Sequence, residues 1–333
     1  MYEIQFHKDS LAEKSFLITG GAGFIGSNLV EYLLKYGAKK VRVLDNFSTG
    51  SHFNLEQFKE HPSFELLVGD IRDINYCRQA VEGIDYVSHQ AALGSVPRSI
   101  NDPITTNEVN ITGFLNMLVA ARDARVKNFV YAASSSTYGD HPGLPKVEDK
   151  IGNPLSPYAV TKYVNELYAS VFSKTYDFHT IGLRYFNVFG PRQNPKGPYA
   201  AVIPLFIESA LKGEAPYING DGETSRDFTF VENAVQANIK AMLTDNISNS
   251  EVINIAYGER TTLNELWFKI ADKTNLDLKP AYREERKGDV KHSLANISKA
   301  NSLIGYKPEI SVLAGIVIAL EWYKENLVKL AEK

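Results

Sequence analysis

The sequence predicts an α/β fold in which a doubly wound parallel sheet is followed by a smaller C-terminal lobe. Three observations predict it: short apolar runs that alternate with helical patterns, a glycine-rich turn after the first run, and an acid after the second. Such alternation is typical of a parallel sheet with helices on both faces. We expect residues 1–188 to form the sheet domain and residues 189–333 mainly the lobe, from which elements can return to the main sheet.

Composition and charge exclude several classes of protein. With 36 basic and 39 acidic residues the net charge is −3, which gives no electrostatic reason to expect a nucleic acid or a membrane surface as partner. No apolar run reaches the roughly 18 residues of a membrane span, and residues 1–14 lack the apolar stretch of a signal peptide. The lone Cys77 cannot form an internal disulfide, and one cysteine with seven scattered histidines predicts no metal site. We expect a cytoplasmic globular protein.

The first unit of the chain predicts a dinucleotide site. A buried strand over residues 15–19 is followed by the turn Gly20-Gly21-Ala22-Gly23-Phe24-Ile25-Gly26, a helix, a second strand over residues 41–44 and then Asp45. Glycines in this context let the backbone approach a pyrophosphate, whose charge faces the helix N-terminus. A carboxylate at position 45 accepts hydrogen bonds from ribose hydroxyls and repels a 2′-phosphate. We therefore expect NAD rather than NADP.

The next strands are expected to end at one edge of the sheet. They are predicted over residues 64–68, 84–88 and 128–133, with a helix over residues 103–122 before the last of them. The side chains that follow these strands, or lie just beyond them, are Asp70, Gln90, Ala92 and Ser134. Because ligands of doubly wound sheets bind outside the carboxyl ends of the strands, these residues should line one crevice.

The character of the chain changes after about residue 189. Residues 190–198 form a turn-rich segment with three prolines and two glycines. Beyond it we expect a helix over residues 201–211, a loop over residues 217–226 and a last helix from about Val312. We interpret this part as a substrate lobe built partly from separate pieces.

Tyr158 and Lys162 are the candidates for acid–base chemistry. Four residues apart on one helix, they lie one turn from each other on the same face. A nearby ammonium favours the phenolate and so lowers the pKa of a tyrosine, which can then act as a general base for a hydroxyl proton. The same spacing also occurs by chance on solvated helix faces, so the pair depends on its context.

A hydroxyl cluster provides that context. Residues 134–136 are three serines after a predicted strand, and Tyr138-Gly139 completes a Ser-x-x-x-Tyr-Gly frame. Together with the features above, the chain resembles the extended short-chain dehydrogenase/reductase superfamily over nearly its whole length, which makes residues 1–188 a Rossmann domain that carries the catalytic residues. Within it, the chain is most similar to bacterial UDP-N-acetylglucosamine/UDP-N-acetylgalactosamine C4-epimerases of surface-polysaccharide pathways. The segments that carry the similarity are residues 90–99, 132–142, 183–190, 217–228 and 288–293.

The resemblance implies a redox-neutral inversion of a sugar carbon. Tyr158, stabilised by Lys162, would take the proton of the 4-hydroxyl while C4 gives a hydride to NAD, and the 4-keto sugar would turn over before proton and hydride return. Ser134 would hold the 4-oxygen. For Asn110 the resemblance implies a structural and proton-relay role, and a purely structural role fits equally well. The implied cofactor-binding residues are Gly20, Gly23, Phe24, Ile25, Gly26, Asp45, Asn46, Ser48, Gly50, Asp70, Ile71, Gln90, Ala92, Asn110, Tyr158, Lys162, Tyr185 and Val188.

The resemblance also places the nucleotide sugar. Asn187 would contact a phosphate, Arg226 and Arg286 would pair with the diphosphate, and Asp289 would hold the uridine ribose. The uracil region would be held by the backbone of Ala201 and Val202 and by Tyr217 and Asn219.

Ser293 carries the expectation about the sugar. The matching position is a tyrosine in relatives limited to UDP-glucose and UDP-galactose, and is smaller in relatives that accept N-acetylated sugars. A serine leaves room beside C2 for an acetamido group without excluding plain hexoses. Ser95 and Ser135 could add hydrogen bonds to the acetamido or hydroxyl groups.

Other functions stay open at this point. A 4,6-dehydratase needs an acid and a base where this chain has Ser135 and Ser136, and a UDP-glucuronate 4-epimerase or decarboxylase needs a cation, for which Arg98 is a candidate. An NAD-binding scaffold without activity would not need the intact Ser134, Tyr158 and Lys162.

The resemblance further implies a homodimer that pairs the helices over residues 103–122 and 157–174. The second helix carries Val164, Leu167, Val171 and Phe172 near helical spacing, which is equally compatible with packing on the sheet.

Overall fold

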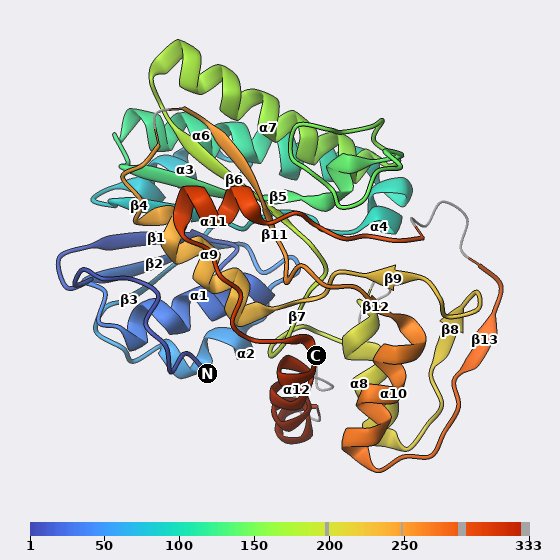
Figure 1. Ribbon diagram of the computed structural model, residues 1–333. Coiled ribbons are helices and arrows are strands. Elements are labelled where there is room, and N and C mark those ends of the chain that lie inside the picture. The colour runs from blue at the N-terminus through green and yellow to red at the C-terminus, as the bar shows by residue number, and fades with distance from the viewer. Residues whose placement is uncertain (197–199, 248, 286–290, 328–333) are drawn as a thin grey trace.

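A seven-stranded parallel sheet organises the protein, as predicted (Figure 1). The structure is a computed structural model that describes residues 1–196, 200–247, 249–285 and 291–327. Across the sheet the strands are β11 (Glu251–Ile255), β6 (Thr180–Tyr185), β5 (Asn128–Ser134), β4 (Tyr86–His89), β1 (Ser15–Thr19), β2 (Lys40–Asp45) and β3 (Phe64–Val68). The chain runs outward from β1 in both directions, so the strand order reverses between β1 and β4. A ligand crevice is expected at such a reversal.

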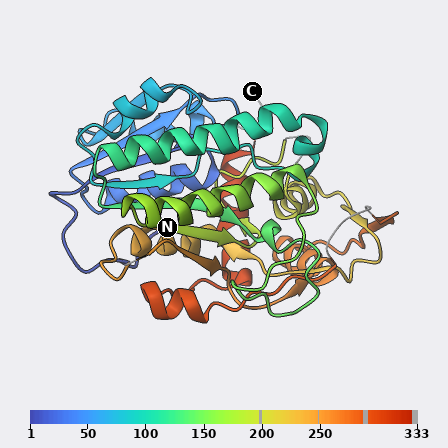
Figure 2. The same cartoon turned by 90° about the horizontal axis from the view of Figure 1, so that it is seen from above.

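Helices cover both faces of the sheet. One face carries α1 (Phe24–Lys35), α9 (Val231–Met242) and α11 (Ser298–Ile304), and the other carries α3 (Ile74–Val81), α6 (Phe114–Asp123) and α7 (Pro157–Tyr176). Figure 2 shows α6 and α7 side by side on their face, where they are in contact. Both α9 and α11, like β11, come from the second half of the chain and join the sheet domain.

Successive side chains of the strands pack alternately into two hydrophobic cores, one on each face of the sheet. Phe16 and Ile18 of β1 pack on the side of α1 and α9, whereas Leu17 between them packs on the side of α6 and α7. All three are fully buried. Successive residues of a strand point to opposite faces, so a continuous apolar run is what a sheet buried on both faces requires.

The remaining part of the chain forms a lobe around a third core. Its helices are α8 (Val202–Lys212), α10 (Leu263–Thr274) and α12 (Val312–Asn326), which pack around Trp267 and Phe206. The predicted start of the last helix at Val312 is right, and Ser311 caps it by accepting the amide of Ala314. Within the part of the chain that the structure describes, no helix is both long and apolar enough to cross a membrane.

One expectation about local structure differs from what is found. Residues 217–226, predicted as a loop, contain β8 (Tyr217–Asn219) and β9 (Ser225–Arg226), which pair with β13 (Ala281–Arg283) and β12 (Thr261–Thr262). These partners lie 35 or more residues away in sequence, so the local pattern cannot reveal them. A third short pair, β7 (Val188–Phe189) with β10 (Thr229–Phe230), joins the lobe to the end of β6.

The helix predicted over residues 103–122 is present, and it contains a π-helical stretch. It consists of α5 (Pro103–Asn107), a π-helical stretch over Glu108–Gly113 and then α6. A Cβ at Gly113 would lie 2.6 Å from the side chain of Ile71, so glycine lets the wider turn sit against the loop after β3. Such π-helical stretches are frequent at functional sites.

Candidate active site

One cleft of about 560 Å³ lies at the carboxyl ends of the central strands. Of the predicted cofactor residues, all except Asn110 line it, together with Ser95, Ser134, Ser135 and Asn187 from the predicted substrate set. Residues that the sequence reasoning missed also line it: Leu44, Thr49, Gly69, Ala91, Leu93, Gly94, Val109, Ala132, Ala133 and Gln193. Most of these are direct neighbours of predicted residues, so the motifs already contained the signal for them.

The glycine turn forms one end of the cleft. Gly20 has a φ of +68°, and a Cβ there would lie 2.7 Å from the amide nitrogen of Ala91. A Cβ at Gly26 would lie 2.2 Å from the carbonyl oxygen of Gly20, so the turn closes tightly on the start of α1. The first amides of α1 have no partner within the helix and face this end, which therefore suits a pyrophosphate.

Asp45 stands at the end of β2 with its carboxylate fixed. Its Oδ2 accepts the amide of Ala22 at 2.9 Å and its Oδ1 accepts the amide of Phe47 at 2.8 Å. Burial raises the pKa of Asp45, and the two backbone amides act in the opposite direction. Each oxygen has a second lone pair, so the carboxylate, which lines the cleft, could also accept hydrogen bonds from ribose hydroxyls.

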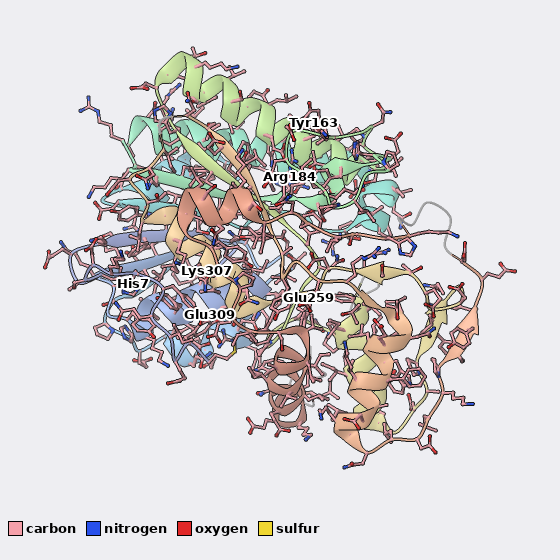
Figure 3. All side chains as sticks on the ribbon, viewed as in Figure 1. His7, Tyr163, Arg184, Glu259, Lys307 and Glu309 are labelled. Carbon is pink, nitrogen blue, oxygen red and sulfur yellow. The ribbon has the colours of Figure 1, made fainter. Side chains whose placement is uncertain are left out.

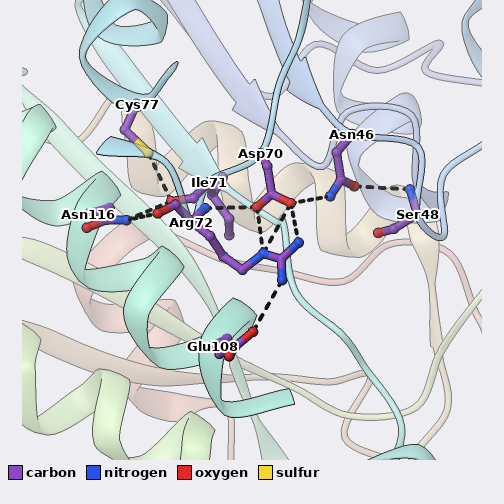
Figure 4. Close-up of polar contacts among 8 residues, drawn as sticks. All are labelled: Asn46, Ser48, Asp70, Ile71, Arg72, Cys77, Glu108 and Asn116. Carbon is purple, nitrogen blue, oxygen red and sulfur yellow. Dashed lines mark hydrogen bonds and ion pairs between the residues drawn. The ribbon is translucent and has the colours of Figure 1, made fainter. Parts of the chain in front are cut away.

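A polar network holds Asp70, which lines the cleft after β3 (Figure 4). Arg72 donates through its backbone amide, its Nε and one terminal nitrogen to this carboxylate at 2.7–3.2 Å, and Asn46 donates at 2.9 Å. The guanidinium of Arg72 lowers the pKa of Asp70 to about 2. Arg72 also reaches Glu108 in the π-helical stretch at 3.3 Å. The sequence reasoning missed Arg72, although its place two residues after Asp70 pointed to it.

The predicted catalytic residues meet on the other side of the cleft. Ser134 ends β5, and its Oγ accepts the amide of Ser136 at 3.1 Å and the Ser136 hydroxyl at 2.8 Å. Tyr158 and Lys162 lie in the first two turns of α7, which begins after the cap Ser156. Lys162 Nζ donates to the carbonyl of Ala132 at 2.7 Å and lies 6.0 Å from the centre of the Tyr158 ring.

The electrostatics of this trio differ from the expectation. Burial raises the pKa of Tyr158, with a hydrogen bond to Ser134 acting in the opposite direction. Burial also lowers the pKa of Lys162 to about 8. The expected lowering of the tyrosine pKa by Lys162 is therefore not found. The Lys162 ammonium donates to the Ala132 carbonyl and lies 6.0 Å from the centre of the Tyr158 ring. Burial, which the sequence does not show, dominates both values.

Two buried contacts fix the catalytic helix α7. Arg184 of β6, labelled in Figure 3, pairs with Glu166 through its Nε at 2.9 Å and a terminal nitrogen at 2.7 Å. Glu166 lies one turn beyond Lys162, and both partners of the pair are buried. Arg184 also donates to the carbonyl of Glu148 at 3.0 Å. One face of α7 carries Tyr158, Lys162 and Glu166 at successive turns. The pair with Arg184 attaches this face to the sheet at Glu166.

Asn110 is the one predicted cofactor residue that the structure does not place at the cleft. It is buried in the π-helical stretch, where its amide accepts from Leu93 N at 2.8 Å and donates to Leu93 O and to Thr161 Oγ1 at 3.2 and 3.1 Å. Its amide group is therefore used to join the cleft loop at Leu93 to α7, next to Lys162. This geometry corresponds to the structural role considered for it.

The floor of the cleft is a second polar network. Gln90 Nε2 donates to Ser88 Oγ at 2.9 Å and to Asn238 Oδ1 at 3.0 Å, while its Oε1 accepts Tyr185 at 3.2 Å. Asn238 of α9 also donates to the Tyr185 hydroxyl at 2.7 Å. Asn238 was missed because it lies 148 residues after Gln90. The network fixes the side chains of Gln90 and Tyr185, both of which were predicted to bind the cofactor.

The predicted substrate residues are placed in three groups. Asn187 and Ser95 line the cleft, and the Ser95 hydroxyl also caps α4 (Val96–Asn101) by accepting the amide of Arg98 at 3.1 Å. Outside the cleft lining lie Ala201, Val202, Tyr217, Asn219, Arg226 and Ser293, all in the lobe or at its border. Arg286 and Asp289 lie outside the described residues.

Several of these lobe residues already have partners. Ala201 is the N-cap residue of α8. The first backbone amides of that helix have no hydrogen-bond acceptor within the helix. Asn219 accepts from Arg283 Nε at 2.6 Å, and the same guanidinium lies 5.5 Å from the centre of the Tyr217 ring. Arg226 donates to the carbonyls of Ser225 and Lys291 at 3.0 and 3.1 Å.

A cleft with a phosphate-binding helix N-terminus at one end and a hydroxyl-rich proton-transfer site at the other defines a class of protein. It is an enzyme that works on a substrate carbon with a bound dinucleotide. The sequence model of the family described as "NAD dependent epimerase/dehydratase family" matches residues 16–256, and the chain belongs to this family.

Individual relatives cover almost the whole chain. The solved structure of UDP-N-acetylglucosamine 4-epimerase from Methanobrevibacter ruminantium, in complex with UDP-N-acetylmuramic acid, is 39% identical with a TM-score of 0.89, over 94% of this chain and 99% of that one. The UDP-glucose 4-epimerase of Mycolicibacterium smegmatis is 34% identical over 93% of this chain and 98% of its own. The UDP-glucuronate 4-epimerase of Thermodesulfobacterium geofontis is 34% identical over 94% and 97%.

The cofactor is NAD, and the residues present fit it. When bound, NAD accepts a hydride from a substrate carbon and returns it. The turn at Gly20–Gly26 would hold the pyrophosphate, and Asp45 the adenosine ribose, where its buried carboxylate would meet a 2′-phosphate with like charge. Asp70, which also lines the cleft, would lie toward the adenosine, and Tyr158 with Lys162 would lie at the reacting end.

Proposed function

We propose that the protein is a UDP-N-acetylhexosamine C4-epimerase that interconverts UDP-N-acetylglucosamine and UDP-N-acetylgalactosamine and also accepts UDP-glucose and UDP-galactose. C4 would give a hydride to NAD, and the 4-keto sugar would turn in the site before the hydride returns to its other face. Tyr158 would move the 4-hydroxyl proton, with Ser134 holding the oxygen and Lys162 supplying positive charge. We expect this chemistry to take place in the cytoplasm.

The observation that carries the choice of sugar is Ser293. Its side chain is half-buried, and its Oγ accepts the amide of Asp227 at 3.4 Å, so the hydroxyl is turned toward the backbone. Its own amide donates to Ser225 O at 3.1 Å. A serine takes up less volume than a tyrosine, and we propose that an acetamido group at C2 of the sugar would use the difference.

The experiment measures C4 inversion by NMR, with purified protein, saturating NAD and each of three substrates: UDP-N-acetylglucosamine, UDP-glucose and UDP-glucuronate. We expect conversion of the first two, faster for the acetylated sugar. Ser293→Tyr should remove activity on the acetylated sugar and keep activity on UDP-glucose, because the ring occupies the space beside C2 only. Equal loss for both sugars, or none, would contradict the role given to Ser293.

A second candidate is epimerisation of UDP-glucuronate. It is favoured by the relative from Thermodesulfobacterium geofontis and by Arg98, which stands in α4 three residues after the cleft residue Ser95. Inversion of UDP-glucuronate without inversion of the two neutral sugars would establish this candidate in place of the first.

The exposed face of α7 supports a homodimer. Val160, Leu167 and Val171 are 46%, 49% and 53% exposed and follow one stripe of the helix, while Phe172 is buried against the sheet. Nearby, Ile104 of α5 is 72% exposed. A second copy of the chain would cover these side chains.

Leu167→Glu should shift the protein from dimer to monomer in analytical ultracentrifugation. Phe268→Glu, at an equally exposed apolar side chain of α10, is the matched control and should leave the mass unchanged. A wild-type mass of one chain would contradict the dimer.

A further inference from the structure

Asp227 is a buried acid to which the chemistry above gives no role. It lies between β9 and β10 with none of its surface exposed. Its Oδ1 accepts the amides of Tyr257 and Gly258, both at 3.1 Å, and its Oδ2 accepts those of Ala295 at 3.1 Å and Gly258 at 3.2 Å. Burial raises the pKa of Asp227 to about 7, and these amides act in the opposite direction. Burying a carboxylate costs desolvation free energy, so we expect this one to hold the segments that bond to it in place.

The segments that it joins come from distant parts of the chain. Tyr257 and Gly258 follow β11 of the main sheet, whereas Ala295 lies close to the end of the chain. In Figure 3 Glu259, the residue after Gly258, lies near the border between the sheet domain and the lobe. The carboxylate therefore connects the sheet to the segment that contains Ser293.

The main chain of Asp227 touches two residues proposed to bind substrate. Its amide donates to Ser293 Oγ at 3.4 Å, and its carbonyl accepts from Asn187 Nδ2 at 3.3 Å. Asn187 lines the cleft, while Ser293 stands outside its lining. One residue thus sets the separation between a cleft residue and the residue expected to face C2 of the sugar.

Further bonds hold the same segment from behind. Lys146 N donates to Leu294 O at 2.7 Å, and Asn296 N donates to Lys146 O at 2.9 Å. Asn254 Nδ2 donates to the carbonyls of Lys146 and Asn296 at 3.0 and 3.1 Å. Between these bonds and Ser293, the amide of Ala295 donates to the Asp227 carboxylate.

We propose that Asp227 is a positioning residue for sugar selection: its carboxylate holds residues 293–295 so that Ser293 leaves room for an acetamido group at C2. The proposal rests on the proposed function and deepens it. Bonds from amides to a buried carboxylate are strong, so losing one acceptor leaves a buried amide without a partner and shifts residues 293–295. A plain hexose has no acetamido group at C2 to contact these residues, so its turnover should be affected less.

Asp227→Asn tests this with little change in size. Its amide NH₂ would face backbone amides that the carboxylate now accepts, so at least one of them loses its acceptor. We expect the KM for UDP-N-acetylglucosamine to rise about tenfold and the kcat/KM ratio of acetylated over plain sugar to fall by a similar factor. The kcat and the bound NAD should stay near the wild-type values, because Ser134, Tyr158 and Lys162 are not touched.

Two further variants complete the test. Asp245→Asn, the same change at an exposed position, is the matched control and should leave both parameters unchanged. Gly258→Ala serves if Asp227→Asn does not fold: the new Cβ has room, with its nearest atom 3.7 Å away, but the φ of +89° disfavours alanine and strains the peptide that the carboxylate holds. It should lower the same ratio about threefold.

The outcomes separate this proposal from the one on which it rests. A ratio that stays at the wild-type value in the folded variant, or a fall in kcat for both sugars at constant KM, would overturn the role of Asp227. A wild-type protein that inverts neither sugar would instead refute the proposed function.

Discussion

Removing the charge of Glu166 should loosen the catalytic helix. Glu166→Gln keeps the size of the side chain and can still accept one bond from Arg184, but it leaves a buried guanidinium without its counter-charge. The side chains of Arg184 and Glu166 are only 4% and 6% exposed. Arg184 stays charged in the variant, because an arginine does not release its proton in proteins.

The expected loss follows from the geometry. The two bonds of 2.7 and 2.9 Å bring the charge centres to about 4 Å, at which distance an attraction of about 4 kcal/mol results with an effective dielectric constant near 20. Breaking a buried pair by removing one partner costs about 3–5 kcal/mol. The bond that glutamine keeps, and the bond of Arg184 to Glu148 O, place the expected loss in the free energy of unfolding near the lower end, about 3 kcal/mol.

Urea unfolding of the NAD-saturated protein, followed by far-UV circular dichroism, measures this loss from the shift of the midpoint. The control is Glu321→Gln, which removes one partner of the exposed pair Glu321–Lys324, and should cost less than about 1 kcal/mol. We also expect kcat to fall in Glu166→Gln, since Tyr158 and Lys162 lie on the same helix row. A loss as small as that of the control would refute the reasoning that this pair anchors α7.

Three other predictions concern the cleft and its surroundings. Tyr158→Phe should lower kcat by about 10²–10⁴-fold without loss of bound NAD, as measured by NMR turnover and absorbance of the purified protein; an active variant would exclude the phenol as proton carrier. Arg72→Gln should raise the Kd for NAD about tenfold in a fluorescence titration, because Asp70 loses the group that orients it; an unchanged Kd would contradict that role. The pKa of Asp227, raised from 3.8 to about 7, means that the folded state holds this proton more tightly than the unfolded state, so wild-type stability falls as the pH rises from about 4 to about 7. The stability of Asp227→Asn relative to wild type should therefore rise over this window by at most about 1.4 kcal/mol per pH unit and level off above it; a constant difference between pH 5 and pH 8 would show that the carboxyl titrates elsewhere.

That the residues expected to bind the cofactor lie at one cleft could be predicted from the sequence, because each follows a locally visible motif. The glycine turn, Asp45 and the carboxyl ends of β3, β4 and β5 follow one another along the chain, and each ends an apolar run that is visible locally. The pair Tyr158–Lys162 depends only on helical spacing. All of these residues line the cleft.

What could not be predicted depends on partners far away in sequence or on burial. Gln90 needs Asn238, 148 residues later, and β8 pairs with β13 more than 60 residues later. The raised pKa of Tyr158 and the lowered pKa of Lys162 come from desolvation, which a sequence pattern does not contain. Asn110 matches a position of the resembled superfamily, yet in the π-helical stretch its side-chain amide bonds to Leu93 and Thr161.

The two sides of the site therefore tolerate change differently. On the cofactor side, glycines stand where a Cβ would meet backbone atoms at 2.2–2.7 Å, so most substitutions there disturb the turn itself. On the proposed substrate side, Asn187 and Ser293 are bonded to the Asp227 main chain, and the Asp227 carboxylate is bonded to Ala295, so a substitution at these polar contacts meets no backbone clash of this kind. The relatives named above are described as epimerases of different UDP-sugars, which such a division predicts. Changes in sugar choice should accordingly be sought at residues 225–227, 257–258 and 293–295 rather than among the residues that line the NAD end.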